Sequence, residues 1–393
     1  MGFSEHFSIA NIPFGIASTS NRSRSVVTRI GDSVVFLSDL GLETSDNVKS
    51  ALCQTTLNDL AAIDKAELQQ LRKKIQQLMT DNTTLSQYGV PVDDVELHLP
   101  INVTEFTSYT CFLEHFKNAQ KAVTGAHSKL PLAESFPISY SARSSSIVVS
   151  GTRIARPYGL YSDGEQIVFG PSRAVDYELE VACIIGKPTQ FGTRVSILDA
   201  KDHIFGLVLM NDWSARDIQG VEMGLLGPMN SKSFATSISP WVVTLEALEP
   251  FATPPMPKAR PPPPYLVDSG KTSTYDVTLQ ADILTEDGYT SICKSQLRWM
   301  HWTFEDIIAQ QTINGCNIRT GDVMSVGTAS GAGDAEHGCL LEVTNGGKVT
   351  WETSTGQKRM YLQDRDGVCI SGYAGGGVGF GDCLGFIDAP DPL

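Results

Sequence analysis

Three acidic residues recur at every second position in one short segment of this 393-residue chain. The segment is Asp176-Tyr177-Glu178-Leu179-Glu180, in which acidic and apolar residues alternate. If it forms a β-strand, all three carboxylates lie on one face, because successive side chains point to opposite faces. Crowded like charges repel one another unless they face water or a cation. From this segment alone, a solvent-facing polar strand and a cation site are equally good interpretations.

A fourth carboxylate, Asp212, favours the cation site. It stands just after the apolar run from Ile204 to Met210 and directly before Trp213. Such a run is typical of a strand buried on both faces, and an unpaired carboxylate at its end would be costly. A divalent cation that prefers oxygen ligands, such as Mg²⁺ or Ca²⁺, would neutralise these groups. The spacing therefore predicts a metal site built from carboxylates.

One long motif and several shorter ones resemble those of the fumarylacetoacetase family. The long motif runs from Met210 to Gln219 and reads Met-Asn-Asp-Trp-Ser-Ala-Arg-Asp-Ile-Gln. The shorter motifs follow the family order: Ile147-Val148-Val149-Ser150-Gly151, Gly227-Pro228, Lys232-Ser233-Phe234, Ser239-Pro240-Trp241, Asn314-Gly315-Cys316-Asn317-Ile318-Arg319 and Gly327-Thr328. The resemblance is strong over roughly residues 98 to 385. It is weaker before that, where Asn11-Ile12-Pro13-Phe14-Gly15 and Ile30-Gly31-Asp32 still fit.

This resemblance implies a mixed α+β fold that is mostly β. The expected domains are a small N-terminal SH3-like barrel with a helix over residues 1–95, and a larger fumarylacetoacetase-type mixed β-roll over residues 96–393. It also implies a homodimer.

The resemblance also assigns roles to individual residues. It implies metal ligation by Glu178, Glu180 and Asp212, and a general base, His115, supported by Glu342. Arg216, Gln219 and Lys232 would stabilise the oxyanion and the departing carbanion, and Thr328 would contact the substrate. Taken singly, His115 could be an ordinary half-buried histidine and Lys232 a surface lysine. Arg216 could be structural, paired with Asp217 or another carboxylate.

Four positions depart from the family pattern. Ser108 stands where the family's full-length hydrolases carry a fourth carboxylate ligand, so a serine hydroxyl or a water would have to complete the metal shell. Thr110 replaces a tyrosine of the substrate pocket, Thr124 an arginine and Met223 a second tyrosine. Threonine is a poor substitute for an arginine that holds a carboxylate with two hydrogen bonds. The altered pocket therefore predicts a less anionic, bulkier substrate.

Several elements must position these residues. Short β segments such as Ser33 to Leu37 open the chain, and a helix is expected after Asp64, with Leu68, Leu71, Ile75 and Leu78 on one face. Glycine-punctuated β segments dominate after His98. The segment Pro254–Pro264 holds seven prolines and should be an extended surface loop, with a proline-binding partner as the alternative. The glycines from Gly375 to Gly381 should form tight β turns and not a phosphate loop.

The composition limits the possible partners. The formal net charge is −14, from 44 acidic against 30 basic residues, which argues against nucleic acid and anionic membranes as partners. The eight cysteines form no C-x-x-C pair, and no signal peptide or membrane span is visible, so a cytoplasmic protein with mostly buried thiols is expected.

The sequence thus predicts a metal-dependent hydrolase that cleaves a carbon–carbon bond in a 1,3-dicarbonyl, of acylpyruvate or β-diketone type, other than fumarylacetoacetate. The expected cofactor is Mg²⁺, with Mn²⁺ or Ca²⁺ as alternatives, and the expected partner is a small-molecule dicarbonyl. One alternative is a decarboxylase, tautomerase or carbon–carbon bond-forming enzyme that uses the same metal-enolate chemistry. The other is a non-catalytic binding subunit.

Overall fold

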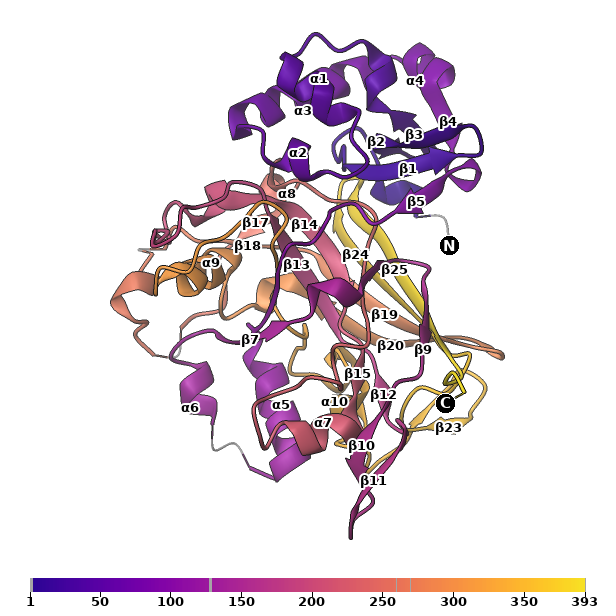
Figure 1. The fold of residues 1–393 in the computed structure, drawn as a ribbon, viewed down its shortest axis with the longest axis vertical. Coiled ribbons are helices and arrows are strands. Elements are labelled where there is room, and N and C mark those ends of the chain that lie inside the picture. Colours follow the sequence, from indigo (N-terminus) through magenta and orange to yellow (C-terminus); the bar gives the residue numbers. More distant parts are fainter. Residues whose placement is uncertain (1–2, 127–128, 259, 269, 393) are drawn as a thin grey trace.

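The computed structural model describes residues 3–126, 129–258, 260–268 and 270–392 (Figure 1). The N-terminal part, drawn in indigo at the top of Figure 1, contains a five-stranded sheet and the helices that cover it. Within the described residues the strand order is β4-β3-β2-β1-β5. The strands are β1 (Gly15–Thr19), β2 (Arg22–Ile30), β3 (Ser33–Phe36), β4 (Gly89–Pro91) and β5 (Glu96–His98). The helices are α1 (Asp46–Leu52), α2 (Asn58–Ala61), α3 (Lys65–Met79) and α4 (Asn82–Tyr88).

Helix α3 is the predicted amphipathic helix, with one difference. Asp64 is its N-cap, as expected, and accepts a hydrogen bond from the amide of Ala66. Leu71 and Ile75 are buried, but Leu78 is 36% exposed and Met79 is buried in its place. Met79 follows Ile75 by four positions, which is about one helical turn, so Met79 continues the apolar face. The prediction for Leu78 was wrong.

The larger part of the chain, which follows the N-terminal sheet, is built around a seven-stranded sheet. Within the described chain its order is β7-β6-β21-β13-β14-β16-β8. Every residue of strands β13 and β14 is buried, as predicted for the run from Ile204. Alternate residues of the strand Leu179–Ile185 pack into two different hydrophobic clusters, one on each face of the sheet. The strands are β6 (Phe106–Thr110), β7 (Ile138–Ala142), β8 (Ile147–Val149), β13 (Leu179–Ile185), β14 (Ile204–Asn211), β16 (Thr236–Ile238) and β21 (Val323–Ser325).

A third sheet, of five strands in the described residues, packs beside it in the order β20-β19-β24-β25-β9. Its strands are β9 (Arg153–Ala155), β19 (Thr278–Thr285), β20 (Gly288–Gln296), β24 (Gly367–Gly375) and β25 (Val378–Asp388). The turn between β24 and β25 holds Gly375, Gly376 and Gly377, all with positive φ (105°, 57° and 78°). Left-handed backbone of this kind favours glycine, so the predicted tight turn is confirmed.

Short elements complete the region. The helices are α5 (Leu113–Thr124), α6 (Leu130–Ala133), α7 (Arg216–Glu222), α8 (Leu245–Leu248), α9 (Phe304–Thr312) and α10 (Leu340–Val343). The small hairpins and bridged pairs are β10 (Tyr158–Ser162) with β11 (Ile167–Pro171), β12 (Val175–Asp176) with β15 (Ser214–Ala215), β17 (Ala252–Thr253) with β18 (Thr274–Tyr275), and β22 (Trp351–Glu352) with β23 (Lys358–Arg359). The expected mixed, mostly β fold class is confirmed.

The proline-rich segment is largely exposed, but it is anchored. Lys258 donates a 2.8 Å hydrogen bond to Asp306, and its ammonium lies 3.8 Å from the ring centroid of Trp302. The segment is therefore an exposed loop, as expected, and Lys258 anchors it to the folded core.

The thiols of all eight cysteines are free, and only Cys53 and Cys316 are exposed. None of the helices in the described residues has the length and apolar character needed to cross a membrane.

Candidate active site

Three of the predicted carboxylates meet where strand β13 begins and strand β14 ends. Strand β13 pairs with β14 so that Glu180 lies opposite Met210, and the amide of Asp212 donates to the carbonyl oxygen of Glu178. One carboxylate oxygen from each of Glu178, Glu180 and Asp212 lies within 4.8 Å of the other two. All three residues are buried. The pairing of two apolar strands therefore brings together acids that are 32 to 34 residues apart in the chain.

Glu180 provides the strongest indication that a cation belongs here. Both of its carboxylate oxygens are buried and have no hydrogen-bond partner among the described residues. Burial and the charges of Glu178 and Asp212 raise its pKa well above the usual value, and the nearby Lys232 opposes this only in part. Buried polar atoms are nearly always satisfied, and three carboxylates form the oxygen donor set that Mg²⁺ and Ca²⁺ prefer. The residues present therefore fit a hard divalent ion.

Lys232 lies between two of these carboxylates. Its ammonium is 2.6 Å from Glu178 Oε2 and 2.9 Å from Asp212 Oδ2. It is buried, so the surface interpretation of this lysine was wrong. Burial opposes the charge of Glu178, but Lys232 and then Arg216 hold its pKa well below the usual value. Burial raises the pKa of Asp212, and Lys232 opposes that shift.

Arg216 opens helix α7 and links the carboxylates to a second acid. Its guanidinium lies 2.9 Å from Glu178 and 2.7 Å from Asp176, and it donates a 3.0 Å bond to Gln219. Asp217 is not its partner, because that carboxylate accepts from Ser172 and from the amide of Arg173. The Nη2 atom of Arg216 is buried without a partner among the described residues. One strong donor is thus left available for a ligand.

Asp176 does not join the metal cluster, so the prediction of three carboxylates on one strand face was wrong. Strand β12 ends at Asp176 and β13 begins at Leu179, so the alternating segment is not one continuous strand. The Asp176 side chain accepts the amides of Leu340 and Leu341 at 2.7 and 2.9 Å. It therefore caps helix α10 at its positive end.

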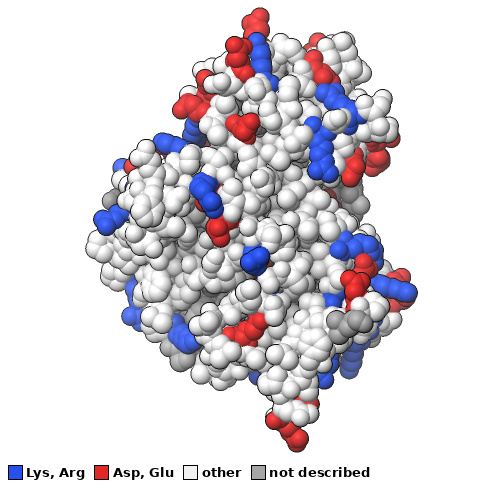
Figure 2. Space-filling model, in the orientation of Figure 1, with Lys and Arg blue, Asp and Glu red and all other residues white. Residues whose placement is uncertain are grey.

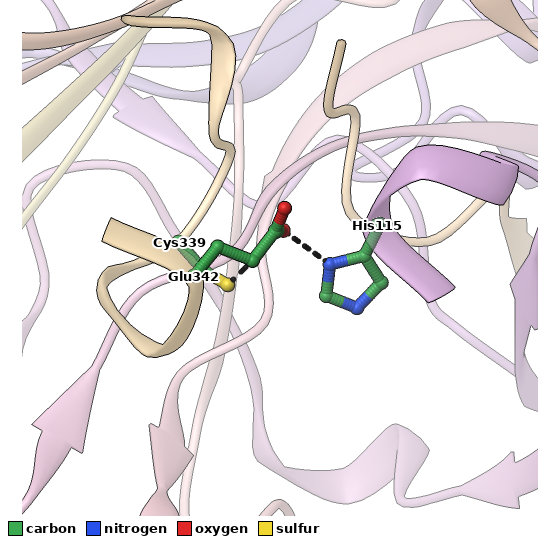
Figure 3. Close-up of side chains that lie close together, drawn as sticks. All are labelled: His115, Cys339 and Glu342. Atoms are coloured by element: carbon green, nitrogen blue, oxygen red, sulfur yellow. Dashed lines mark hydrogen bonds and ion pairs between the residues drawn. The ribbon is translucent and has the colours of Figure 1, made fainter. Parts of the chain in front are cut away.

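His115 and Glu342 form a hydrogen-bonded pair (Figure 3). The Nδ1 atom of His115, on α5, lies 2.5 Å from Oε1 of Glu342, on α10. Glu342 was expected between strand residues but lies in a short helix, because Asp176 satisfies the first amides of α10. Figure 3 shows the second ring nitrogen, Nε2, pointing away from Glu342. The imidazole also contributes, after Lys232 and Arg216, to the lowered pKa of Glu178. The arrangement suits a base oriented by a carboxylate.

Three further donors hold Glu342, and the sequence analysis missed them. Ser330 donates to Oε1 at 2.7 Å, Asn118 donates to Oε2 at 3.1 Å, and the Cys339 thiol lies 3.5 Å from Oε1. Burial alone would raise the pKa of Glu342, but His115, Ser330 and Asn118 lower it. Asn118 stands one helical turn after His115, a spacing that could have suggested a shared partner.

Tyr140 is another residue that the sequence analysis missed. It lies on strand β7, and its hydroxyl donates a 2.9 Å bond to Oδ2 of Asp212, the oxygen that Lys232 also contacts. Burial and the nearby Asp212 raise the pKa of this phenol well above its usual value, so it remains a donor. Its alternation with Ser139 and Ser141 was the available signal.

Of the remaining predicted residues, Ser108 and Thr328 are buried and Thr110 is half-buried, whereas Thr124 and Met223 are exposed. Ser108 is buried on β6 and accepts a 3.1 Å bond from Ser325, the same serine that acts on Glu180. Thr328 is buried, and its hydroxyl has no partner among the described residues. Thr110 is half-buried at the end of β6, but Thr124 is exposed and bonds to Gln120 of its own helix. Met223 is 58% exposed.

Comparisons with known proteins match this chain to one family along most of its length. Residues 104–383 match the family described as fumarylacetoacetate (FAA) hydrolase C-terminal, and residues 10–100 match fumarylacetoacetase N-terminal. The chain is 38% identical to the fumarylacetoacetase of Arabidopsis thaliana, covering 100% of this chain and 98% of the relative. It is 37% identical to that of Rattus norvegicus, covering 97% and 96%.

Solved structures share the fold at lower identity. A fumarylacetoacetate hydrolase from Exiguobacterium antarcticum has a TM-score of 0.56 at 16% identity, covering 96% of this chain and 99% of that one. A maleylpyruvate hydrolase from Sphingobium has a TM-score of 0.53 at 16% identity, covering 95% and 99%.

Proposed function

Because this chain belongs to the fumarylacetoacetate hydrolase family, whose members cleave carbon–carbon bonds, we propose that it hydrolyses a 1,3-dicarbonyl of the acylpyruvate or β-diketone class. Two observations carry this proposal: a histidine–carboxylate pair, and a set of buried polar atoms that have no partner among the described residues. The atoms are both carboxylate oxygens of Glu180, Nη2 of Arg216 and the hydroxyl of Thr328. The two Glu180 oxygens suit a cation, and the Arg216 and Thr328 groups suit an oxygen-rich ligand.

The chain's own residues can supply each proton and charge that the reaction needs. A divalent ion held by Glu178, Glu180 and Asp212 would act as a Lewis acid towards the two substrate oxygens. His115 takes a proton from water at Nε2 while Glu342 stabilises the resulting imidazolium. The hydroxide adds to one carbonyl carbon, and Arg216 and Gln219 stabilise the oxyanion. The carbon–carbon bond then breaks, and its electron pair leaves with the enolate carbon. That carbon takes up the proton that His115 removed from water.

We propose that the substrate is not fumarylacetoacetate itself. Thr110, Thr124 and Met223 occupy positions where the family carries groups that hold the substrate's carboxylate and carbonyls. The loop after α7 exposes two apolar side chains, Leu225 and Leu226, at 79% and 105%. The end of this loop is held by Glu222, whose carboxylate accepts hydrogen bonds from the amides of Met229, Asn230 and Ser231. A neutral or bulkier acyl group would fit such a surface better than a second carboxylate.

The same proposal includes Mg²⁺ as the resident ion, with Mn²⁺ or Ca²⁺ as alternatives, and Ser108 beside the metal shell. It also includes a homodimer, a cytoplasmic location and two domains, residues 1–95 and 96–393. The three-carboxylate donor set supports Mg²⁺ over Ca²⁺, because Ca²⁺ sites commonly use more oxygen ligands.

The test is a metal analysis followed by a substrate panel. The purified protein, loaded with Mg²⁺, is incubated with fumarylacetoacetate, acylpyruvates and neutral β-diketones, and the products are identified. Two acyl fragments, with oxygen from labelled water in one of them, support hydrolysis. Release of CO₂ or an isomerised substrate without labelled oxygen would instead indicate a decarboxylase or tautomerase.

A further inference from the structure

A cavity that contains none of the carboxylate-cluster residues is lined by Lys358 and Arg359 of the β22–β23 hairpin. Its volume is about 610 Å³, large enough for a small organic molecule. Four basic side chains line it: Arg156, Arg173, Lys358 and Arg359. In Figure 2 blue side chains are visible at the lower right, where Figure 1 labels β23. In a chain with a net charge of −14, four cations around one cavity are a local reversal of sign.

Most of this positive charge is not neutralised by the protein. Arg156 is paired with Asp364 at 2.6 Å. By contrast, none of the carboxylates in the described ranges forms an ion pair with Arg173, Lys358 or Arg359. Asp366 is influenced by Arg359 through space, but it accepts the amide of Gln363 instead. Glu352 is the strand partner of Lys358 in the hairpin, but the two side chains form no ion pair in the described structure.

One of these cations also has an unsatisfied donor. The Nε atom of Arg359 is buried and has no hydrogen-bond partner among the residues described. A buried guanidinium N–H normally finds an acceptor, so an unfilled donor next to a cavity indicates a missing acceptor. Arginine binds carboxylates and phosphates through paired N–H groups. The lining also includes Thr350, Tyr361 and Gln363, which can add neutral hydrogen bonds.

We infer that this cavity is a binding site for a small oxyanion, the phosphate or carboxylate group of an organic ligand. Apolar lining from Met360 and Leu362 would contact the organic part of that ligand. The site is distinct from the candidate active site, because none of the residues assigned there lines it. Two residues that line the cavity, Ser172 and Arg173, donate hydrogen bonds to Asp217, which follows Arg216 in helix α7.

The experiment measures anion binding by the full-length protein without any substrate. Inorganic phosphate and, separately, succinate are titrated at constant ionic strength, and binding is followed by calorimetry and by the unfolding temperature. The test variant is Lys358→Gln with Arg359→Gln. The control is Lys294→Gln with Arg365→Gln, which removes the same charge from two exposed residues outside the cavity.

Saturable binding of either anion is expected in the wild-type protein and in the control, and a loss of affinity of at least about tenfold is expected in the test variant. Preference for phosphate or for succinate identifies the head group. If Arg359→Gln disturbs folding, Lys358→Gln alone, at an exposed position, should still weaken binding measurably. No binding of either anion, or equal affinity in the test variant and the control, would overturn the inference.

Discussion

The ammonium group of Lys232 lies 2.6 Å from a carboxylate oxygen of Glu178, with both side chains buried. A buried ion pair is worth little against an apolar replacement, but loss of one partner leaves an uncompensated buried charge. In the carboxylate cluster this lysine neutralises part of the negative charge of the three acidic residues. Its removal should therefore destabilise the metal-free form more than the metal-loaded form.

We predict that Lys232→Met lowers the free energy of unfolding of the metal-free protein by about 3–5 kcal/mol. Mg²⁺ should recover more stability in this variant than in the wild type, because it replaces the missing positive charge. Chemical denaturation with EDTA and with Mg²⁺ measures both quantities. The control is Lys201→Met, whose exposed pair with Glu249 should change stability by less than about 1 kcal/mol. An equal loss in EDTA and in Mg²⁺ would contradict the metal site.

Ser108 gives a second test of the metal shell. Ser108→Asp would restore a fourth carboxylate, and divalent-ion affinity should rise by about tenfold or more, with Ca²⁺ gaining most. The metal-free variant should be less stable than the wild type, since it buries another charge. Calorimetric titration with Mg²⁺ and Ca²⁺ measures the change, and Ser108→Asn serves as the uncharged control. Unchanged affinity would place Ser108 outside the shell.

The third prediction concerns the base. His115→Ala should lower kcat by roughly two to four orders of magnitude, while KM changes little. The reason is that the imidazole removes a proton in the transition state but is not the main contact of the bound substrate. Steady-state kinetics on the best substrate of the panel measures this. Full turnover by the variant would move the reaction into the decarboxylase or tautomerase class, which does not require activated water.

Asn118 and Ser330 should act on the reaction only through Glu342. We predict that Asn118→Ala or Ser330→Ala lowers kcat about tenfold with little change in KM. In a Glu342→Gln background the same substitutions should have almost no further effect, because the carboxylate that they orient is gone. The control is Lys117→Ala on the same helix, which pairs only with Glu114 in the described structure. Additive losses in the double variants would indicate a general structural role instead.

The sequence allowed the buried strand and the grouping of the carboxylates to be predicted, but not the contacts between distant segments. The run from Ile204 forms a buried strand, and Glu178 and Glu180 lie in one group with Asp212. Asp176 broke the pattern because its partners, Arg216 and helix α10, come from segments far along the chain.

The missed residues have the same cause. Tyr140 meets Asp212 only because β7 folds beside β6 in the seven-stranded sheet. Ser330 meets Glu342 through a turn that no periodicity describes. Local patterns predict elements, whereas the partners of a buried polar group depend on the packing of the whole sheet.

The last prediction concerns Thr124, which ends the helix that carries His115. Its hydroxyl donates a 2.8 Å bond to the carbonyl of Gln120, so it offers no charged group to a substrate carboxylate. An arginine that binds a carboxylate with two hydrogen bonds typically contributes a few kcal/mol, or about two orders of magnitude in kcat/KM.

Fumarylacetoacetate should therefore be a poorer substrate here by about that factor than for relatives with the full set of contacts. Thr124→Arg should raise kcat/KM for fumarylacetoacetate by about tenfold without improving neutral β-diketones. The control is Val123→Arg, which adds the same charge at the preceding position, where the side chain is 68% exposed. Equal gains from both variants would indicate simple electrostatic attraction. Efficient hydrolysis of fumarylacetoacetate by the wild-type chain would show that Thr110, Thr124 and Met223 do not exclude this substrate.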